Sequence, residues 1–327
     1  MSISEMLLVP FLLASFNGNK IFDLAGDLAT SAVSKLLTTA NSSHLLAMPP
    51  VNERQVRVKV GTEEDAKYYF SYAVLSYCNS SVIREWKCRS CQKMGSDWKV
   101  QDVVKDMILE TQGVVAVNHK RKEIGIVFRG SNGLNNQIQN SLFQQVPLEK
   151  LNPAIKVHFG FSNIASGLQT QVLAAVKILR EQRSVRDYSI TMTGHSMGGA
   201  VAAIMAINIQ REFNIPWDRF SIYTYGQPRT GNLEFANYYN SLPLKITRTV
   251  NENDVVPHVP ANFQGYFHTL TELYIQNNKA RVCLSRLVED DTCSKSRVSD
   301  LNKDSHDIAW DMSLGEGNCQ PYTTPYS

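Results

Sequence analysis

The sequence has little excess of charge of either sign. Among its 327 residues, 33 are lysine or arginine and 30 are aspartate or glutamate, which leaves a formal net charge of +3. The longest basic run is Lys120-Arg121-Lys122, so the clustered positive charge typical of nucleic-acid-binding proteins is missing. We therefore expect no nucleic-acid partner.

The chain also lacks an apolar run long enough to cross a membrane. The longest such stretch, Met6–Phe16, has about half of the 18 or more residues that a transmembrane helix needs. Its length suits the apolar part of a signal peptide, although the residues before it include Glu5 and no lysine or arginine. We expect no transmembrane segment. Residues 1–18 are interpreted as a signal peptide or a short apolar segment, residues 19–60 as a pro-segment or N-terminal extension, and residues 61–327 as one domain.

Neither an internal repeat nor a low-complexity tract interrupts the chain. Segments with apolar residues at helical spacing alternate instead with runs of β-forming residues. A polar loop that contains cysteines is expected before Trp98. We expect helices at about 63–78, 162–183 and 198–213, and strands at 113–117, 123–128, 188–193, 219–225, 245–250 and 271–276. The first two strands read as a hairpin. Such alternation predicts an α/β fold with a mostly parallel central sheet and helices on both faces.

A catalytic motif lies between the strand at 188–193 and the helix that follows it. The residues Gly194-His195-Ser196-Met197-Gly198 form G-x-S-x-G in the strand-turn-helix context of a nucleophile elbow. In so sharp a turn, a Cβ atom at either glycine should collide with a neighbouring element, and the backbone of Ser196 should be strained. The alternative to a catalytic motif is a helix that simply starts with several glycines. We interpret Ser196 as the nucleophile.

A serine nucleophile needs a base and an orienting acid, which in this architecture follow it in the order acid, then histidine. The segment Asn251-Glu252-Asn253-Asp254 follows the strand at 245–250, at the end of the strand where α/β sites assemble. We choose Asp254 as the acid. Glu252 is the competing carboxylate, but its position nearer the strand end fits a solvated or capping role better.

Three histidines follow Asp254 and compete for the role of base. The tether between His258 and Asp254 is short and is stiffened by Pro257, so His258 fits a structural role. His268 enters a β-run and is interpreted as a packed residue. His306 lies on a polar loop after the last expected strand, where the third member of a triad should be. We choose His306.

The oxyanion hole requires a second backbone donor from the loop after an earlier strand. The segment Val127-Phe128-Arg129-Gly130-Ser131 has this position. We expect the N–H groups of Ser131 and Met197 to bind the oxyanion together, and loss of one such donor typically costs about 10² to 10³ in rate.

Together these motifs resemble the fungal class 3 lipases, a family of secreted mould triacylglycerol lipases that also includes feruloyl esterases and phospholipases A1. The resemblance covers about Glu63 to Cys319 and includes VFRGS, VHFGF, GHSMGGA, GQPRTGN, NENDVVPHVP and GYFHTLTE. It implies an α/β-hydrolase fold, with Ser196, Asp254 and His306 as the triad and Ser131 and Met197 as oxyanion donors. It also implies hydrolysis of lipid esters without a cofactor or metal, with a soluble feruloyl or short-chain esterase or a phospholipase A1 as the alternatives.

The resemblance gives a pairing for the six cysteines, whose connectivity the sequence alone leaves open. It implies disulfides between Cys78 and Cys319, Cys88 and Cys91, and Cys283 and Cys293. A zinc site at the first C-x-x-C would need a second ligand pair, which the last two cysteines do not offer by their spacing. Three disulfides favour an oxidising compartment, so we expect a protein of the secretory pathway.

In the family, the segment after the oxyanion serine forms a helical lid over the site. The corresponding residues here are mainly polar, and glutamine stands where lipases of this type tend to carry tryptophan. The expected lid comprises Asn132, Gly133, Leu134, Asn135, Asn136, Gln137 and Ile138. A polar lid is more typical of the family's esterases. The partner is therefore expected to be a lipid or another ester, met at a lipid–water interface or in solution; the sequence does not indicate an oligomeric state.

Overall fold

The structure, a computed structural model, describes residues 57–131, 143–148, 151–284 and 289–320. The expected signal peptide at 1–18, nearly all of the expected extension at 19–60, and the expected lid at 132–138 lie outside the described residues. The described chain pairs with the rest of the fold from its first residues: Arg57 N donates to Asn240 O (2.8 Å), and Lys59 pairs with the start of the strand at Lys245.

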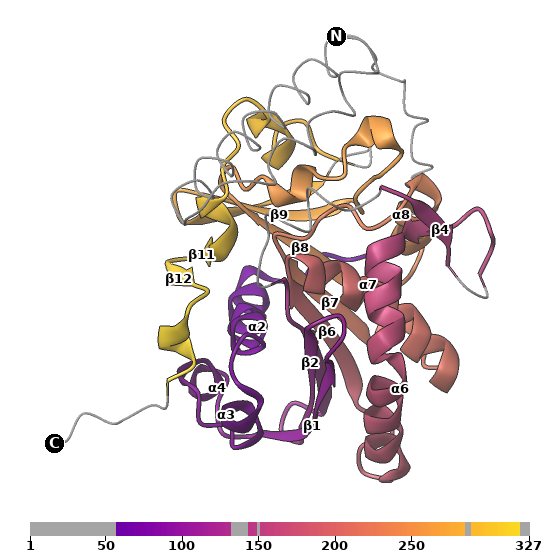
Figure 1. The fold of residues 1–327 in the computed structure, drawn as a ribbon, viewed down its shortest axis with the longest axis vertical. Coiled ribbons are helices and arrows are strands. Elements are labelled where there is room, and N and C mark those ends of the chain that lie inside the picture. The colour runs from indigo at the N-terminus through magenta and orange to yellow at the C-terminus, as the bar shows by residue number, and fades with distance from the viewer. Residues whose placement is uncertain (1–56, 132–142, 149–150, 285–288, 321–327) are drawn as a thin grey trace, which may run out of the picture.

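One eight-stranded sheet forms the centre of the fold (Figure 1). In spatial order its strands are β1 (Trp98–Asp106), β2 (Thr111–Asn118), β3 (Glu123–Phe128), β6 (Ser189–His195), β7 (Phe220–Tyr225), β8 (Lys245–Asn251), β9 (Thr271–Gln276) and β10 (Lys279–Leu284). The five neighbours β3, β6, β7, β8 and β9 are parallel, whereas β1, β2 and β3 pair antiparallel at one edge and β9 and β10 at the other. This arrangement confirms the predicted α/β fold and the hairpin at its edge.

Both faces of the sheet are buried, because apolar residues occupy successive positions along its central strands. In β2, Val115 and Val117 belong to the core on one face, and Val114 and Ala116 belong to the core on the other. Side chains alternate between faces along a strand, so a continuous apolar run supplies two cores at once. A sheet of this kind needs helices on both sides.

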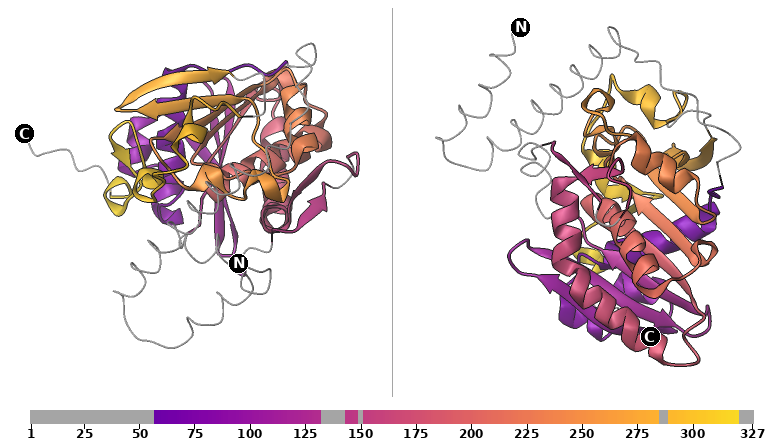
Figure 2. Two further views of the ribbon diagram at one scale, coloured as in Figure 1. Left: turned by 90° about the horizontal axis from the view of Figure 1, so that it is seen from above. Right: turned by 90° about the vertical axis from the view of Figure 1, so that its right-hand side faces the viewer.

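The helices cover these two faces. The amphipathic α6 (Phe159–Glu181) and the almost wholly buried α7 (Met197–Phe213) lie side by side on one face, where α8 (Leu233–Asn240) joins them (Figure 2). On the opposite face lies α2 (Glu63–Leu75) (Figure 1). Its first turn carries three acidic residues, which favour a helix N-terminus, and the Thr62 hydroxyl accepts from Asp65 N.

Several elements were not expected from the sequence. The predicted loop before Trp98 contains two short helices, α3 (Ser80–Arg84) and α4 (Arg89–Lys93), and α2 ends at Leu75 rather than near Cys78. The strands β1 and β10 and the helix α8 were also missed, as were the two-stranded pairs β4 (Gln145–Pro147) with β5 (Lys156–His158) and β11 (Ile308–Ala309) with β12 (Met312–Ser313). Most are short or lie at an edge, where periodicity is weak.

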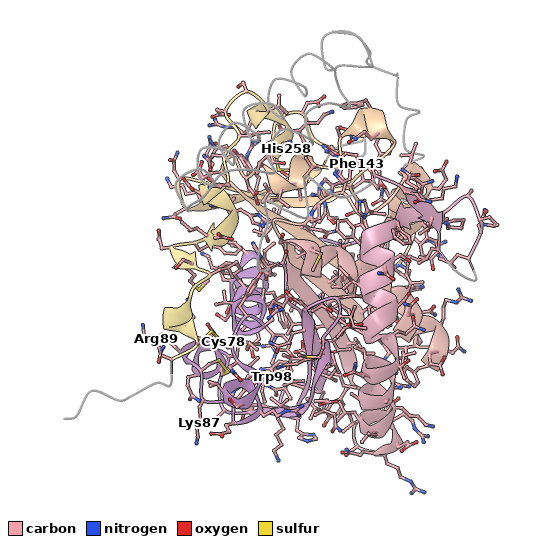
Figure 3. All side chains as sticks on the ribbon, in the orientation of Figure 1. Cys78, Lys87, Arg89, Trp98, Phe143 and His258 are labelled. Atoms are coloured by element: carbon pink, nitrogen blue, oxygen red, sulfur yellow. A yellow bond between two sulfur atoms is a disulfide. The ribbon has the colours of Figure 1, made fainter. Side chains whose placement is uncertain are left out.

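Three disulfides cross-link the chain: Cys78–Cys319, Cys88–Cys91 and Cys283–Cys293. These are the pairs that the family resemblance implies. Cys78, just beyond α2, lies beside the C-terminal segment, so its bridge closes a loop across 241 residues of sequence (Figure 3). No helix within the described residues is long and apolar enough to cross a bilayer.

Candidate active site

Ser196 lies in a strained turn between β6 and α7. Its backbone dihedrals are φ 55° and ψ −133°, a combination that residues other than glycine rarely adopt. A Cβ added to Gly194 would overlap the main chain of Gly198, and one added to Gly198 would overlap the carbonyl of Phe128. The turn is fixed further by Ser196 N, which donates to Tyr225 O (2.8 Å). Both glycines are therefore required by close approach of the backbone, as the motif predicts.

The carboxyl ends of four neighbouring parallel strands bring the site residues to one edge of the sheet. Phe128 of β3 is in register with Gly194 of β6, so the loops that follow these two strands begin side by side. In the first loop, Gly130 packs so tightly that an added Cβ would lie 3.0 Å from the Cβ of Ser196 and 2.8 Å from His195 O. Ser131 is the next residue, so the fold holds it close to the elbow.

Asp254 and His306 form a buried pair in which a ring nitrogen faces a carboxylate. The distance from His306 Nδ1 is 2.8 Å to Asp254 Oδ2 and 3.0 Å to Oδ1, and both side chains are only 1% exposed. Asp254 Oδ1 also accepts from Val256 N (2.9 Å). The other ring nitrogen of His306, Nε2, is buried and has no hydrogen-bond partner among the described residues. With Nδ1–H donating to the carboxylate, Nε2 is left as a free base.

Gly226, the residue after β7, packs against this pair. Its φ is +54°, and an added Cβ would lie 2.6 Å from two ring atoms of His306 and 2.7 Å from Asp254 Oδ2. The preceding residue is Tyr225, whose carbonyl accepts from Ser196. The absence of a side chain at Gly226 therefore lets the histidine approach the end of β7, which is the neighbour of β6 in the sheet.

The loop after β8 also fastens the segment that carries His306. Asn253 Oδ1 accepts from Asn302 Nδ2 (2.8 Å) and from Ser305 Oγ (2.9 Å). Asn251 Nδ2 donates to Ser305 O (3.2 Å), and the backbones of Asp254 and Asn302 form a β-bridge. Asp254 and the residues just before it thus hold the main chain immediately before His306, which fixes the two partners relative to each other.

The competing acid and histidines of the sequence lie in other surroundings. Glu252 Oε1 accepts from Asn277 N (2.6 Å) and thereby caps the turn between β9 and β10. His268 Nε2 donates to Pro257 O (2.8 Å). His258 ends a buried helical turn after β8 (Figure 3), and its carbonyl accepts from Arg229. Burial, together with Arg229, lowers the pKa of His258 to about 3, so the ring stays neutral. Among the three candidate histidines, only the ring of His306 is hydrogen-bonded to Asp254.

Met197 is the first residue of α7. The N–H groups of a helix's first turn have no partner within the helix, and the helix dipole makes this end favourable for negative charge. Ser131 follows the neighbouring strand β3, so the two expected oxyanion donors lie on loops that begin at adjacent strand ends. This arrangement can bind an oxygen that gains charge beside Ser196.

Two groups of side chains within the described residues have the composition of a metal site. One contains His195, His306 and Asp307, and therefore overlaps the histidine that is bonded to Asp254. The other contains Glu272 with Cys283 and Cys293, whose sulfur atoms are bonded to each other. Disulfide sulfurs cannot act as thiolate ligands.

Some residues of the site were missed by sequence reasoning. Gly226 and Gly130 stand in the quoted motifs GQPRTGN and VFRGS, where a glycine at a strand end signals close approach. Asn253 precedes Asp254 in the sequence, but no motif indicates that its side chain binds the segment before His306. The contacts of Tyr77 with His195 had no sequence signal, because they join residues separated by 118 positions.

The parallel sheet, the strained serine and the buried Asp254–His306 pair define an α/β-hydrolase. The comparisons narrow this class. A family model described as "Lipase (class 3)" matches residues 125–264. The lipase of Rhizomucor miehei is 36% identical over 236 residues, which cover 71% of this chain and 64% of that protein. Secreted mono- and diacylglycerol lipase 1 of Fusarium solani is 30% identical over 257 residues, covering 76% of this chain and 72% of that protein.

A solved structure agrees with these sequence matches. It is a triacylglycerol lipase whose catalytic centre is described as a serine protease triad. The match has a TM-score of 0.72 and 32% sequence identity, and it covers 80% of this chain and 99% of the lipase chain. The chain belongs to the class 3 lipase family. It spans 64% of the length of the Rhizomucor miehei lipase and of the lipases from Rhizopus niveus and Rhizopus oryzae.

Proposed function

We propose that the protein is a serine hydrolase that cleaves carboxylic ester bonds of lipids, as a triacylglycerol lipase. The observation that carries the proposal is a strained serine whose N–H is bonded to Tyr225, together with a buried His306–Asp254 pair that packs on the next residue, Gly226, and whose His306 Nε2 is unpaired among the described residues. Class 3 lipase family membership and the relatives named lipase support the same reaction.

In the proposed reaction, Ser196 Oγ attacks the acyl carbonyl carbon and His306 Nε2 takes the hydroxyl proton. The N–H groups of Met197 and Ser131 bind the oxyanion of the tetrahedral intermediate. Collapse of this intermediate breaks the ester C–O bond, and His306 gives its proton to the departing alcohol. Water then hydrolyses the acyl-enzyme by the same steps. Asp254 holds the Nδ1–H tautomer throughout and stabilises the imidazolium.

A second substrate class has specific support. The Fusarium solani relative is named as a lipase of mono- and diacylglycerols, so partial glycerides are a second candidate. The polar lid sequence around Gln137 favours a soluble ester as a third. Because the structure joins three cystine pairs and the same relative is named as secreted, we also propose that the protein is secreted, with residues 1–18 as its signal peptide and 19–60 as its pro-segment.

The experiment compares Ser196→Ala with Ser189→Ala, a control at the start of the same strand. Initial rates are measured against tributyrin across its solubility limit, with disulfide-intact protein. We expect only background turnover from Ser196→Ala, unchanged turnover from Ser189→Ala, and a rise in wild-type rate when the emulsion forms. Activity retained by Ser196→Ala would exclude the mechanism. A smooth saturation without a rise would favour a soluble ester, and a preference for diolein over triolein would favour partial glycerides.

A further inference from the structure

A short series of hydrogen bonds connects the loop of Ser131 to the main chain of His306 and does not use the side chains of Ser196, Asp254 or His306. Tyr77 Oη lies 2.7 Å from His195 Nδ1, and His195 Nε2 lies 2.9 Å from the main-chain oxygen of His306. The backbone of Gly130 makes a further hydrogen bond with the Tyr77 hydroxyl. One histidine thus stands between the oxyanion loop and the proposed base.

The directions of these bonds follow from the groups involved. A carbonyl oxygen can only accept, so His195 Nε2 must carry the hydrogen that reaches His306 O. Burial holds the pKa of His195 well below the usual value for histidine, so the ring is neutral and Nδ1 is a bare acceptor. The Tyr77 hydroxyl must then donate to Nδ1, and its own oxygen accepts from Gly130. One tautomer of His195 therefore satisfies every bond of the series.

His195 is placed to influence all parts of the proposed site at once. It is the last residue of β6 and immediately precedes Ser196. Its carbonyl oxygen packs against Gly130, and its ring lies with its centroid 4.3 Å from that of the His306 ring. It bonds to the main chain of His306 and does not occupy the Nε2 atom that the reaction uses.

We propose that His195, held in one tautomer by Tyr77, is a positioning residue that fixes the main chain of His306 relative to Ser196 and the oxyanion loop. The proposal rests on the proposed function. The segment before His306 is hydrogen-bonded to the loop after β8. The bond from His195, in contrast, connects His306 itself to the end of β6. Loss of that bond frees the base to move relative to the nucleophile, and a shift of about 1 Å can cost about 100-fold in rate.

The test uses four variants and one control. His195→Leu removes both ring bonds at similar volume; His195→Gln keeps a donor near the position of Nε2, and His195→Asn keeps an acceptor near that of Nδ1. Tyr77→Phe removes the donor that holds the ring. Tyr72→Phe is the control, because its buried hydroxyl donates to Gly125 O (2.9 Å), and Tyr72 belongs to neither the triad nor the oxyanion loop. kcat and KM for tributyrin are normalised to active sites titrated with a p-nitrophenyl phosphonate.

We expect kcat to fall about 10- to 100-fold in His195→Leu and about fivefold or more in Tyr77→Phe, with KM within twofold of wild type. His195→Gln should recover at least about fivefold more kcat than His195→Asn, because only the glutamine restores the bond to His306 O. Tyr72→Phe should lower Tm and leave kcat unchanged. If His195→Leu does not fold, Tyr77→Phe against Tyr72→Phe decides the question.

Equal kcat in Tyr77→Phe and Tyr72→Phe would overturn the proposal, and so would equal recovery by glutamine and asparagine. Either result would mean that the pair only stabilises the fold. Failure of the proposed function looks different, because Ser196→Ala would then keep its activity and wild-type protein would not react with the phosphonate.

Discussion

Replacement of Gly226 by alanine tests whether the site depends on close approach of His306 to the end of β7. The backbone at Gly226 has φ +54°, where a Cβ costs about 1–2 kcal/mol. The added atom would also lie 2.6 Å from His306 Cε1 and Nδ1 and 2.7 Å from Asp254 Oδ2. Because these atoms belong to a buried, hydrogen-bonded pair, the ring must move to relieve the overlap.

We expect Gly226→Ala to lower kcat about 100-fold with KM little changed, which corresponds to about 2.7 kcal/mol of transition-state stabilisation. KM should change little because the overlap falls on the His306 and Asp254 side chains. The assay is the rate of tributyrin hydrolysis per titrated active site. A urea denaturation curve of the same protein gives the separate cost in stability.

Gly95→Ala is the matched control. Gly95 also has a left-handed backbone, with φ +90°, but no described atom lies within 4 Å of an added Cβ. Its replacement should lower stability by the backbone term alone and leave kcat unchanged. If Gly226→Ala keeps kcat within about twofold of wild type, or if Gly95→Ala loses as much, the close approach of His306 to this strand end does not control the reaction.

Three further predictions concern the acid, the buried His158 and the longest cross-link. Asp254→Asn should lower kcat by about 10⁴ while leaving Tm nearly unchanged, because an amide favours the wrong tautomer of His306; a loss below tenfold would contradict the assignment. Burial lowers the pKa of His158 to about 4, so between pH 6.5 and 4 the unfolded chain binds a proton that the folded chain excludes. The free energy of unfolding should therefore fall as the pH falls, by up to about 1.4 kcal/mol per pH unit from this residue. Urea curves for His158→Asn should show a shallower pH dependence of this free energy. An equally steep pH dependence would refute its attribution to His158. Replacing Cys78 and Cys319 by serine should lower the free energy of unfolding by about 5 kcal/mol in the chain-entropy model, because their bridge spans 241 residues; a loss below about 1 kcal/mol would show that this loop entropy is not what the bridge contributes.

The elements predicted well from the sequence are those in which a local pattern and the tertiary contacts agree. The central strands are continuous apolar runs, α6 has apolar residues at helical spacing, and α7 is a long apolar segment that starts at the elbow, which is specified by two glycines that the backbone needs. The choice of Asp254 and His306 came from their order along the chain, and the structure places them in hydrogen-bond contact.

The missed elements lack such local patterns. The alternation in β1 is broken by an irregularity between Val100 and Asp102, so its residues do not follow one period. The edge strand β10 has exposed positions such as Val282, and α8 is only eight residues long. The pair of Tyr77 and His195 depends on side chains that meet only after the sheet has formed, and a single sequence carries no signal for such a contact.

The segment at 289–320, which carries His306, contains no helix or strand longer than four residues. It is covalently joined to the rest of the fold through Cys293, which is bonded to β10, and through Cys319, which is bonded to the end of the first described helix. Both links also belong to the hydrophobic cores: Cys78 packs in the core beside α2, and Cys283 and Cys293 pack with Val250 and Tyr274. A chain that matures with reduced thiols should therefore be less stable as a whole, and its His306 segment should also lack both covalent attachments. The redox state in which the chain matures would then act as a checkpoint on the placement of His306 beside Asp254.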